Sequence, residues 1–161
     1  MVSTKIKEIL FEDLSFKMYE EALQINIHSL ECIWDSKNIF EVLEKENVSG
    51  VVLKNEINDR IMGFVVYESM LFSVEILNLV VHPDYRREGV GSLIIDFLKE
   101  DYSDSKAIRY KLRESNLIGQ IFLKNNNFVS EGVVKYYFSD SYPNCIEKEN
   151  AYSFLFLKIK N

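Results

Sequence analysis

The chain has 161 residues, of which 47% are hydrophobic and 27% charged, and its formal net charge is −6. This length and composition predict one globular domain over 1–161 with a substantial core, and the negative charge argues against nucleic acid or an anionic membrane as the main partner. Cys32 and Cys145 are far apart and lack metal-ligand spacing, so we expect reduced thiols, no metal site and a cytoplasmic location. We also expect no signal peptide and no membrane span, because the N-terminus lacks an apolar segment and no apolar run is long enough.

The first part of the chain alternates between strand and helix patterns. We expect a strand over 5–10, a helix capped by Asp13, an interruption over 28–34, and a second helix capped by Asp35 or Ser36. The apolar faces of these helices are expected to consist of Leu14, Met18, Ala22 and Ile25 in the first and Ile39, Phe40 and Leu43 in the second. Two strands are expected next, over 51–53 and 61–67, with turns over 47–50 and 55–60.

The most informative stretch, 75–98, predicts a strand, a turn and a helix. A nearly continuous apolar run over 76–81 is typical of a strand buried on both faces. Pro83 ends it, because proline has no N–H to give to a sheet. The apolar residues of the helix recur at i, i+3, i+4, i+7 and i+8, namely Val90, Leu93, Ile94, Phe97 and Leu98. At the junction, Gly89 and Gly91 leave backbone N–H groups uncovered at the positive end of a helix dipole, which suits an anion such as a pyrophosphate.

This junction resembles the acetyl-CoA signature of the GNAT superfamily of N-acetyltransferases. Arg86-x-x-Gly89-x-Gly91 follows an apolar strand and opens an amphipathic helix, and Arg86 and Arg87 add positive charge. A glycine-rich turn without a ligand is the alternative. A dinucleotide-binding fingerprint would need a third glycine in place of Ile94, and a P-loop would need a Gly-Lys-Ser/Thr ending. By the resemblance, the backbone groups that hold acetyl-CoA belong to Leu79, Val80, Val81, Arg86, Arg87, Glu88, Gly89, Val90, Gly91 and Ser92.

The rest of the chain continues the same arrangement. We expect strands over 107–112, 128–138 and 151–159, and a helix that starts at Asn116 and ends within 125–127. The buried stripe of that helix is expected to consist of Leu117, Ile118, Ile121 and Phe122. The order of elements resembles the GNAT fold over nearly the whole chain. The resemblance implies an α/β fold with a mixed, mostly antiparallel sheet of six to seven strands, flanked by about four helices and splayed at its central strands.

Glu75 and Tyr137 are the candidate catalytic residues. Glu75 is a carboxylate at the start of an apolar strand, where partial burial favours the protonated form and suits a general base. Some GNAT enzymes have a base at the matching position, and a solvated strand-end glutamate is the alternative. Asn116 by resemblance contacts the pantetheine arm, and a plain helix cap is the alternative. His28 and His82 have no Ser, Cys or metal-ligand partner at a recognisable spacing.

The chain is most similar to the ribosomal-protein alanine N-acetyltransferases and related protein N-terminal acetyltransferases. The segments that resemble them are 84–91, 113–116, 135–137 and 149–152. The resemblance implies acetyl-CoA as co-substrate and a protein or peptide N-terminus as the favoured acceptor, with Trp34, Tyr136 and Tyr137 lining its groove. Ordinary aromatic packing is the alternative for all three side chains. A small-molecule amine as the acceptor and a homodimer are left open.

Two positions depart from those enzymes. Lys111 stands where they have a catalytic Glu or His, and a lysine is a poor base near neutrality unless it is desolvated. Leu123 stands where they have a tyrosine acid, and leucine cannot donate a proton. A degenerate GNAT domain that binds acyl-CoA without turnover is therefore an alternative to an active enzyme.

Overall fold

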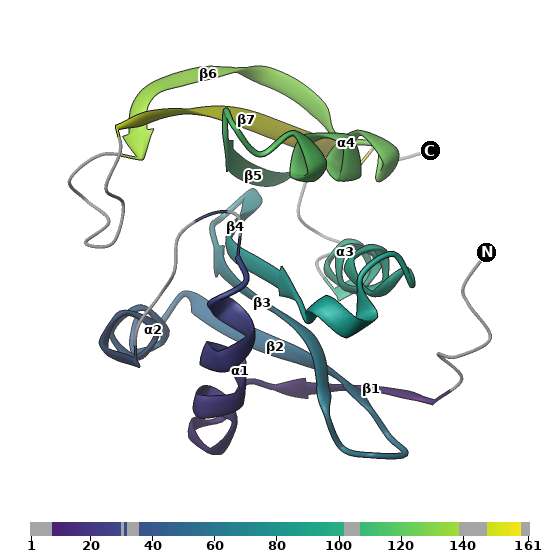
Figure 1. Ribbon diagram of the computed structural model, residues 1–161. Helices are drawn as coiled ribbons and strands as arrows, with labels where there is room; N and C mark the ends of the chain where they lie inside the picture. Colours follow the sequence, from purple (N-terminus) through teal and green to yellow (C-terminus); the bar gives the residue numbers. More distant parts are fainter. Residues whose placement is uncertain (1–7, 30, 32–35, 102–106, 139–147, 159–161) are drawn as a thin grey trace.

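Seven strands form one sheet in the computed structural model, which describes residues 8–29, 31, 36–101, 107–138 and 148–158 (Figure 1). The strands are β1 (Ile9–Asp13), β2 (Val48–Asn55), β3 (Ile61–Ser69), β4 (Ser73–Val81), β5 (Ala107–Arg113), β6 (Val129–Phe138) and β7 (Glu149–Leu157). The helices are α1 (Tyr19–Asn26), α2 (Ser36–Leu43), α3 (Val90–Asp101) and α4 (Leu117–Asn125), with short 3-10 helices at Phe16–Met18 and Pro83–Tyr85. Within the described ranges, no helix is long and apolar enough to cross a membrane.

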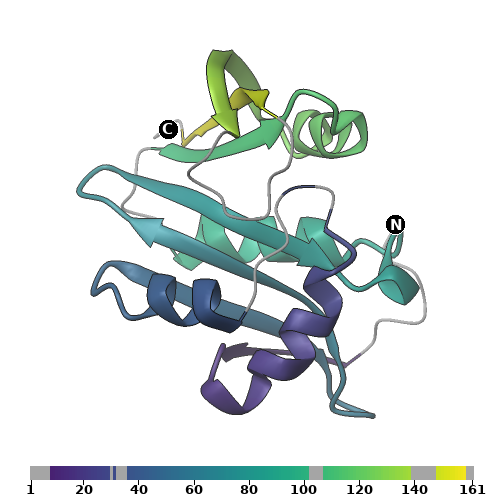
Figure 2. The same ribbon diagram turned by 60° about the vertical axis from the view of Figure 1, so that its left-hand side comes forward.

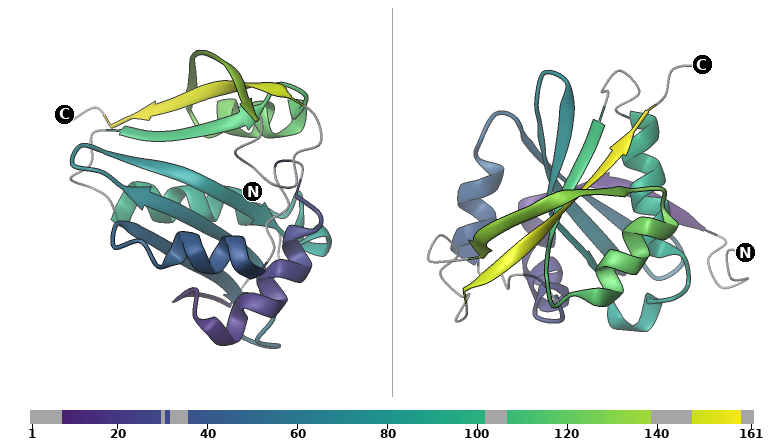
Figure 3. Two further views of the ribbon diagram at one scale, coloured as in Figure 1. Left: turned by 90° about the vertical axis from the view of Figure 1, so that its left-hand side faces the viewer. Right: turned by 90° about the horizontal axis from the view of Figure 1, so that it is seen from above.

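The sheet has the order β1-β2-β3-β4-β5-β7-β6, and its neighbouring strands are antiparallel except for β4 and β5. The parallel pairing of β4 with β5 comprises four residue pairs and ends at Ile76↔Tyr110. A bulge follows directly, since Ile76 pairs with Tyr67 of β3 but Asn78 pairs with Val66, which leaves Leu77 as the extra residue. Beyond this point β4 and β5 diverge, and Figure 3 shows β5, β7 and β6 swung away from the other strands. The predicted mixed, mostly antiparallel sheet of six to seven strands, flanked by about four helices and splayed at its centre, is confirmed.

Helices cover both faces of the sheet and enclose two cores. Figure 2 shows α1 and α2 on one face and α3 on the other. The α3/α4 core is the larger, and its fully buried side chains include Leu53, Ile94, Leu98 and Leu123. The α1/α2 core contains, among others, Ala22, Ile25, Ile39 and Phe64. Because both faces of β4 are covered, the predicted apolar run of that strand is explained.

The first strand and the first helix begin later than predicted. β1 pairs antiparallel with residues 51–55 of β2, so the strand that was expected over 5–10 lies at Ile9–Asp13. Phe11 stacks on Phe97 of α3 at a centroid distance of 4.6 Å, which fixes this edge strand against the core. Asp13 is therefore the last residue of a strand rather than a helix cap, and a 3-10 turn separates it from α1.

The predicted buried stripe of α4 is wrong for three of its four residues, and only Phe122 packs against the core as expected. Leu117, Ile118 and Ile121 are 65%, 64% and 59% exposed, while Leu123 is completely buried. The inward face instead follows the spacing of Asn116, Gly119, Leu123 and Asn126, which includes small and polar residues. Asn116 caps the helix by accepting a hydrogen bond from the Gly119 N–H at 2.9 Å, which satisfies one of the unpaired N–H groups of the first turn.

Candidate functional site

The fork between β4 and β5 exposes backbone that has no strand partner on that side. Leu79 and Val80 pair with β3, but among the described residues no strand pairs with their other edge. The Leu79 N–H donates instead to the Tyr110 hydroxyl at 3.2 Å, and the Val81 carbonyl accepts from Arg86 Nε at 3.1 Å. The predicted cofactor-binding residues of β4 thus lie along one open edge of the strand.

The turn between β4 and α3 has a backbone suited to an anion. Arg87 and Gly89 adopt positive φ angles of 66° and 92°, and a side chain at Gly89 would meet no atom within 4 Å. The Leu93 N–H donates to the Gly89 carbonyl at 3.0 Å, so the N–H groups of Gly91 and Ser92 precede the regular helical hydrogen bonds. These N–H groups and the helix dipole fit the phosphates of a coenzyme A group.

The other predicted residues of this turn have mainly structural contacts. Arg86 extends its guanidinium to the His28 carbonyl at 2.8 Å and thereby ties the turn to the end of α1. Val90 is buried in the α3/α4 core, whereas Glu88 is half-buried and Arg87 is exposed. A Cβ at Gly91 would lie 3.0 and 3.1 Å from two ring atoms of Phe122, so this glycine also allows α3 to approach α4.

On the opposite face of the sheet, Glu75 and Tyr137 are brought together by Lys111. Glu75 is 9% exposed, and its carboxylate forms an ion pair with Lys111 Nζ. The same ammonium lies 5.4 Å from the centroid of the Tyr137 ring. The two candidate catalytic residues therefore contact one amine that sequence reasoning had treated only as a departure from related enzymes.

Tyr136, the residue before Tyr137 on β6, is exposed. Tyr136 has a positive φ of 55° and is 66% exposed, and its N–H donates to Asn150 Oδ1 at 3.0 Å. Tyr137 is half-buried and makes an edge contact with Phe138. Of the two tyrosines, Tyr137 is therefore the more buried one. Trp34 lies outside the described residues.

Lys111 belongs to a row of paired charges along one face of β5. Arg109, Lys111 and Arg113 alternate with apolar residues, so all three point to the α1/α2 face. Arg109 pairs with Glu131 of β6 at 3.2 Å, and Arg113 pairs with Glu149 of β7 at 2.9 Å. With Lys111 and Glu75 in the middle, this row ties β4, β6 and β7 to β5 across the fork.

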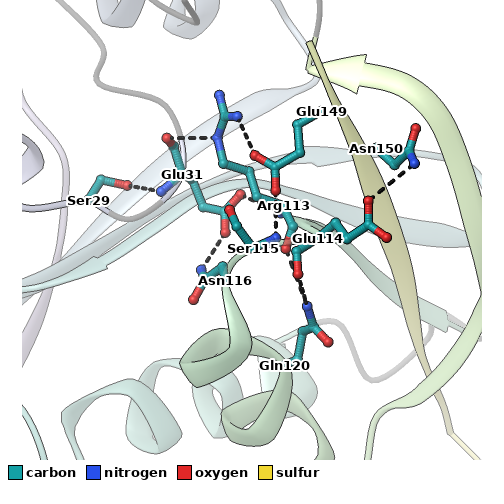
Figure 4. A network of polar contacts seen from close by, with 9 residues as sticks. All are labelled: Ser29, Glu31, Arg113, Glu114, Ser115, Asn116, Gln120, Glu149 and Asn150. Atoms are coloured by element: carbon teal, nitrogen blue, oxygen red, sulfur yellow. Dashed lines mark hydrogen bonds and ion pairs between the residues drawn. The ribbon is translucent and has the colours of Figure 1, made fainter. Parts of the chain in front are cut away.

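A network of polar contacts links the segment after α1 to the start of α4 (Figure 4). The Glu31 carboxylate accepts hydrogen bonds from the Arg113 N–H at 2.9 Å and from Asn116 Nδ2. The Glu31 carbonyl accepts from Arg113 Nε at 3.2 Å, and Glu149 accepts from Ser115 N–H. Asn116 is therefore a helix cap that also binds Glu31, and a contact with pantetheine stays a prediction.

Asn78, the residue directly after the bulge, is a second buried polar group near the fork. Its side chain is 2% exposed, and its Nδ2 donates to Asn26 Oδ1 at 2.9 Å. No donor among the described residues reaches Asn78 Oδ1. A buried oxygen that accepts no hydrogen bond costs stability, so we expect a water molecule to donate to it.

Stability should depend on pH through Glu31. Burial raises the pKa of the Glu31 carboxyl above its ordinary 4.5, although hydrogen bonds from Asn116 and Arg113 oppose this rise. The folded protein therefore keeps a proton that the unfolded chain releases, and the contribution of Glu31 to stability declines as pH rises above about 4.5. Urea unfolding of the parent and of Glu31→Gln should show the parent losing stability relative to the variant as pH rises from 4.5 towards neutrality.

Glu149→Gln is the matched control for that measurement. Burial alone would raise the pKa of Glu149, but hydrogen bonds from Ser115 and Arg113 lower it on balance. The stability that Glu149 contributes is therefore present above its unfolded value of 4.5 and declines at lower pH. Parallel stability curves for the parent and Glu31→Gln above pH 4.5 would contradict the role given to Glu31.

The sequence indicated the basic residues of β5 but not the carboxylates that pair with them. The alternation of basic and apolar residues over 107–113 was visible, but the carboxylates that neutralise it lie on three other strands, 22 to 36 positions away. Glu31 and Asn78 had no visible signal, because nothing local distinguishes a buried polar side chain from an exposed one.

Comparisons with known proteins agree with this architecture. Residues 46–130 match the family described as "Acetyltransferase (GNAT) domain". A curated relative, an "Uncharacterized N-acetyltransferase" of Archaeoglobus fulgidus, is 28% identical over 101 residues, covering 58% of this chain and 62% of that protein. The match thus spans less than two thirds of the relative's length.

Solved structures match over most of the chain. The ribosomal-protein-S18-alanine N-acetyltransferase from Escherichia coli has a TM-score of 0.77 at 17% identity, covering 95% of this chain and 96% of that one. NAA60 of Arabidopsis thaliana, in complex with a bisubstrate analogue, has a TM-score of 0.79 at 15% identity, covering 94% and 99%. At these identities the matches show a shared fold.

Proposed function

This chain belongs to the GNAT acetyltransferase family, and from that premise we propose that it transfers an acetyl group from acetyl-CoA to a primary amine. The favoured acceptor is the N-terminus of a protein or peptide. The observation that supports this proposal best is that two candidate regions lie at the same fork, one for the coenzyme and one for the amine. The open turn before α3 suits the coenzyme's phosphates, and Glu75, Lys111 and Tyr137 lie together on the other face of the sheet.

The residues at the fork suit direct transfer from a thioester. The Glu75 carboxylate accepts a proton from the acceptor's ammonium, and the neutral nitrogen attacks the thioester carbonyl. The C–N bond forms as the C–S bond breaks, and coenzyme A leaves as a thiolate. Leu123, at the place of the usual tyrosine acid, is completely buried, so the thiolate takes its proton from solvent or from the attacking nitrogen.

The choice of a peptide acceptor rests on the surroundings of Glu75. The likeness to the Escherichia coli ribosomal-protein-S18-alanine enzyme supports it at the level of fold. The exposed ring of Tyr136 and the half-buried ring of Tyr137 project from β6 at the edge of the site. Their aromatic faces can contact the first residues of a peptide there.

A domain that binds acyl-CoA without turnover is the second candidate. Two observations favour it: the proposed base, Glu75, is already paired with the Lys111 ammonium, and the buried Leu123 cannot act as an acid. This candidate predicts binding of the coenzyme but no release of its thiol above background.

Binding and turnover are tested separately. Acetyl-CoA at 100 times its Kd should add about 2.7 kcal/mol to the free energy of unfolding, measured as a rise in Tm. Thiol release is then followed with N-terminal peptides, polyamines and aminoglycosides. Release with peptides alone supports the favoured acceptor, and release with the small amines alone would replace it.

The remaining outcomes decide against the proposal. A Tm shift without thiol release in any arm supports the second candidate. If neither acetyl-CoA nor a longer acyl-CoA shifts the Tm, the cofactor assignment falls as well.

A further inference from the structure

We propose that Lys111 is an acetylation site of this protein, modified within the same molecule by the acetyl-CoA bound to it. The inference rests on the proposed function, because it needs the thioester at the fork. It follows from the position of the Lys111 amine, from the groups that surround it, and from the fact that this group, like the proposed substrate, is a primary amine.

The position is fixed by the strand pairing. Tyr110 is the last residue of β5 that pairs with β4, so Lys111 is the first residue beyond the point where the strands diverge. On its other side Lys111 pairs with Ser153 of β7, which holds its backbone in place. The side chain therefore starts at the vertex of the fork, on the face opposite α3 and α4.

The surroundings of Nζ are those that an acceptor amine requires. The Glu75 carboxylate is bound to the ammonium and can receive its proton. The Tyr137 ring, at 5.4 Å, offers a face that attracts a cation. The Lys111 side chain is 23% exposed, so the amine is partly accessible. When no acceptor is bound, the amine nearest to the proposed base is the protein's own.

Lys111 differs chemically from the neighbouring cations of β5. Arg109 and Arg113 are paired with carboxylates in the same way, but a guanidinium stays protonated and is not a nucleophile. A lysine amine that has given up one proton is a primary-amine nucleophile, as is a peptide's α-amine. Among the three paired cations of this strand, Lys111 alone can accept an acetyl group.

The reaction balances without a further reagent. The Lys111 ammonium gives one proton to Glu75, and the neutral Nζ attacks the thioester carbonyl carbon. The C–N bond forms, the C–S bond breaks, and the thiolate takes the second proton that the nitrogen loses. The products are Nε-acetyl-lysine and free coenzyme A, and Glu75 returns its proton to solvent. The acetylated side chain has no charge, so its ion pair with Glu75 is lost.

The test uses the full chain with acetyl-CoA and no added acceptor. Mass spectrometry of the intact protein and of its proteolytic peptides follows the acetylation of each lysine over time. Lys54 is the internal reference, because its amine is also bound to carboxylates, those of Asp59 and Glu12. Its side chain is 9% exposed and lies on β2, away from the fork. We expect Lys111 to be acetylated at least about tenfold faster than Lys54, a difference of ~1.4 kcal/mol in barrier.

Two variants and one dilution series make the result decisive. Glu75→Gln should slow the acetylation of Lys111 by about 10²–10⁴ and leave Lys54 unchanged. Lys111→Arg should keep the ion pair and lose the modified peptide. The rate constant should not depend on protein concentration, since the transfer occurs within one molecule. A rate that rises with protein concentration, or one no faster than that of Lys54, would overturn the proposal.

The outcome is separable from that of the proposed function. If acetyl-CoA raises the Tm and peptides are acetylated while Lys111 stays unmodified, only this inference fails. If acetyl-CoA neither binds nor reacts, the proposed function fails first.

Discussion

Glu75→Gln is expected to lower the rate of acetyl transfer by about 10²–10⁴, the usual contribution of a general base, with little change in the Kd of acetyl-CoA. The carboxylate lies on the α1/α2 face and contacts Lys111, whereas the coenzyme's phosphates are assigned to the turn before α3. Steady-state kinetics with a peptide acceptor and the Tm shift with acetyl-CoA measure the two quantities independently.

The ion pair with Lys111 demands a control for folding. Glu75→Gln leaves the Lys111 ammonium without its counter-charge. An unpaired charge lowers the free energy of unfolding, and the loss is larger the more deeply the charge is buried. Glu131→Gln is the matched variant, because it removes a carboxylate from the adjacent pair with Arg109 but lies on β6, which is separated from β4 by β5 and β7 in the sheet. We expect it to retain the parent's rate.

A double variant separates catalysis from stability. Glu75→Gln with Lys111→Met removes the unpaired charge together with the carboxylate. Recovery of stability without recovery of rate is the result expected of a base. If the double variant regained the rate, Glu75 would be a structural partner of Lys111 and the assignment would be wrong.

Gly91→Val is expected to weaken acetyl-CoA binding by about 10- to 150-fold, the equivalent of losing one hydrogen bond to a charged group at about 1.5–3 kcal/mol. A side chain there keeps the backbone N–H groups of the first turn of α3 from the phosphates. It also meets the ring of Phe122, so overpacking should cost about 1–3 kcal/mol of stability. Isothermal titration and urea unfolding measure the two effects.

Phe122→Ala supplies the room that the valine needs. The double variant Gly91→Val/Phe122→Ala should be more stable than the sum of the two single effects predicts, because the clash is gone. Its Kd for acetyl-CoA should stay weak. Recovery of tight binding in the double variant would mean that Gly91 serves only the packing of α3 on α4.

The sequence alone was sufficient for the β4–turn–α3 unit because its signals are local. A doubly buried strand, a proline stop, two glycines and a 3.6-residue period each act over a few neighbouring residues. The predicted stretch 75–98 begins two residues after the start of β4 and ends three residues before the end of α3.

The contacts of Lys111 and the orientation of α4 could not be predicted in the same way. Which carboxylate meets Lys111 depends on the register of β4 against β5 and on the bulge at Leu77, and both are set by tertiary pairing. The α4 prediction failed because hydrophobicity was assumed to mark the inward face. The close approach of Leu112 and Phe122 selects Gly119 and Gly91 at those contacts instead.

The position of β7 between β5 and β6 has a consequence for biosynthesis. A nascent chain completes β5 long before the strand that pairs with its second edge, since Arg113 and Glu149 are 36 residues apart. At about 5–20 residues per second, the ribosome needs roughly 2–7 s to supply that distance. For this interval β5 presents an unpaired edge, which is a template for pairing with other chains.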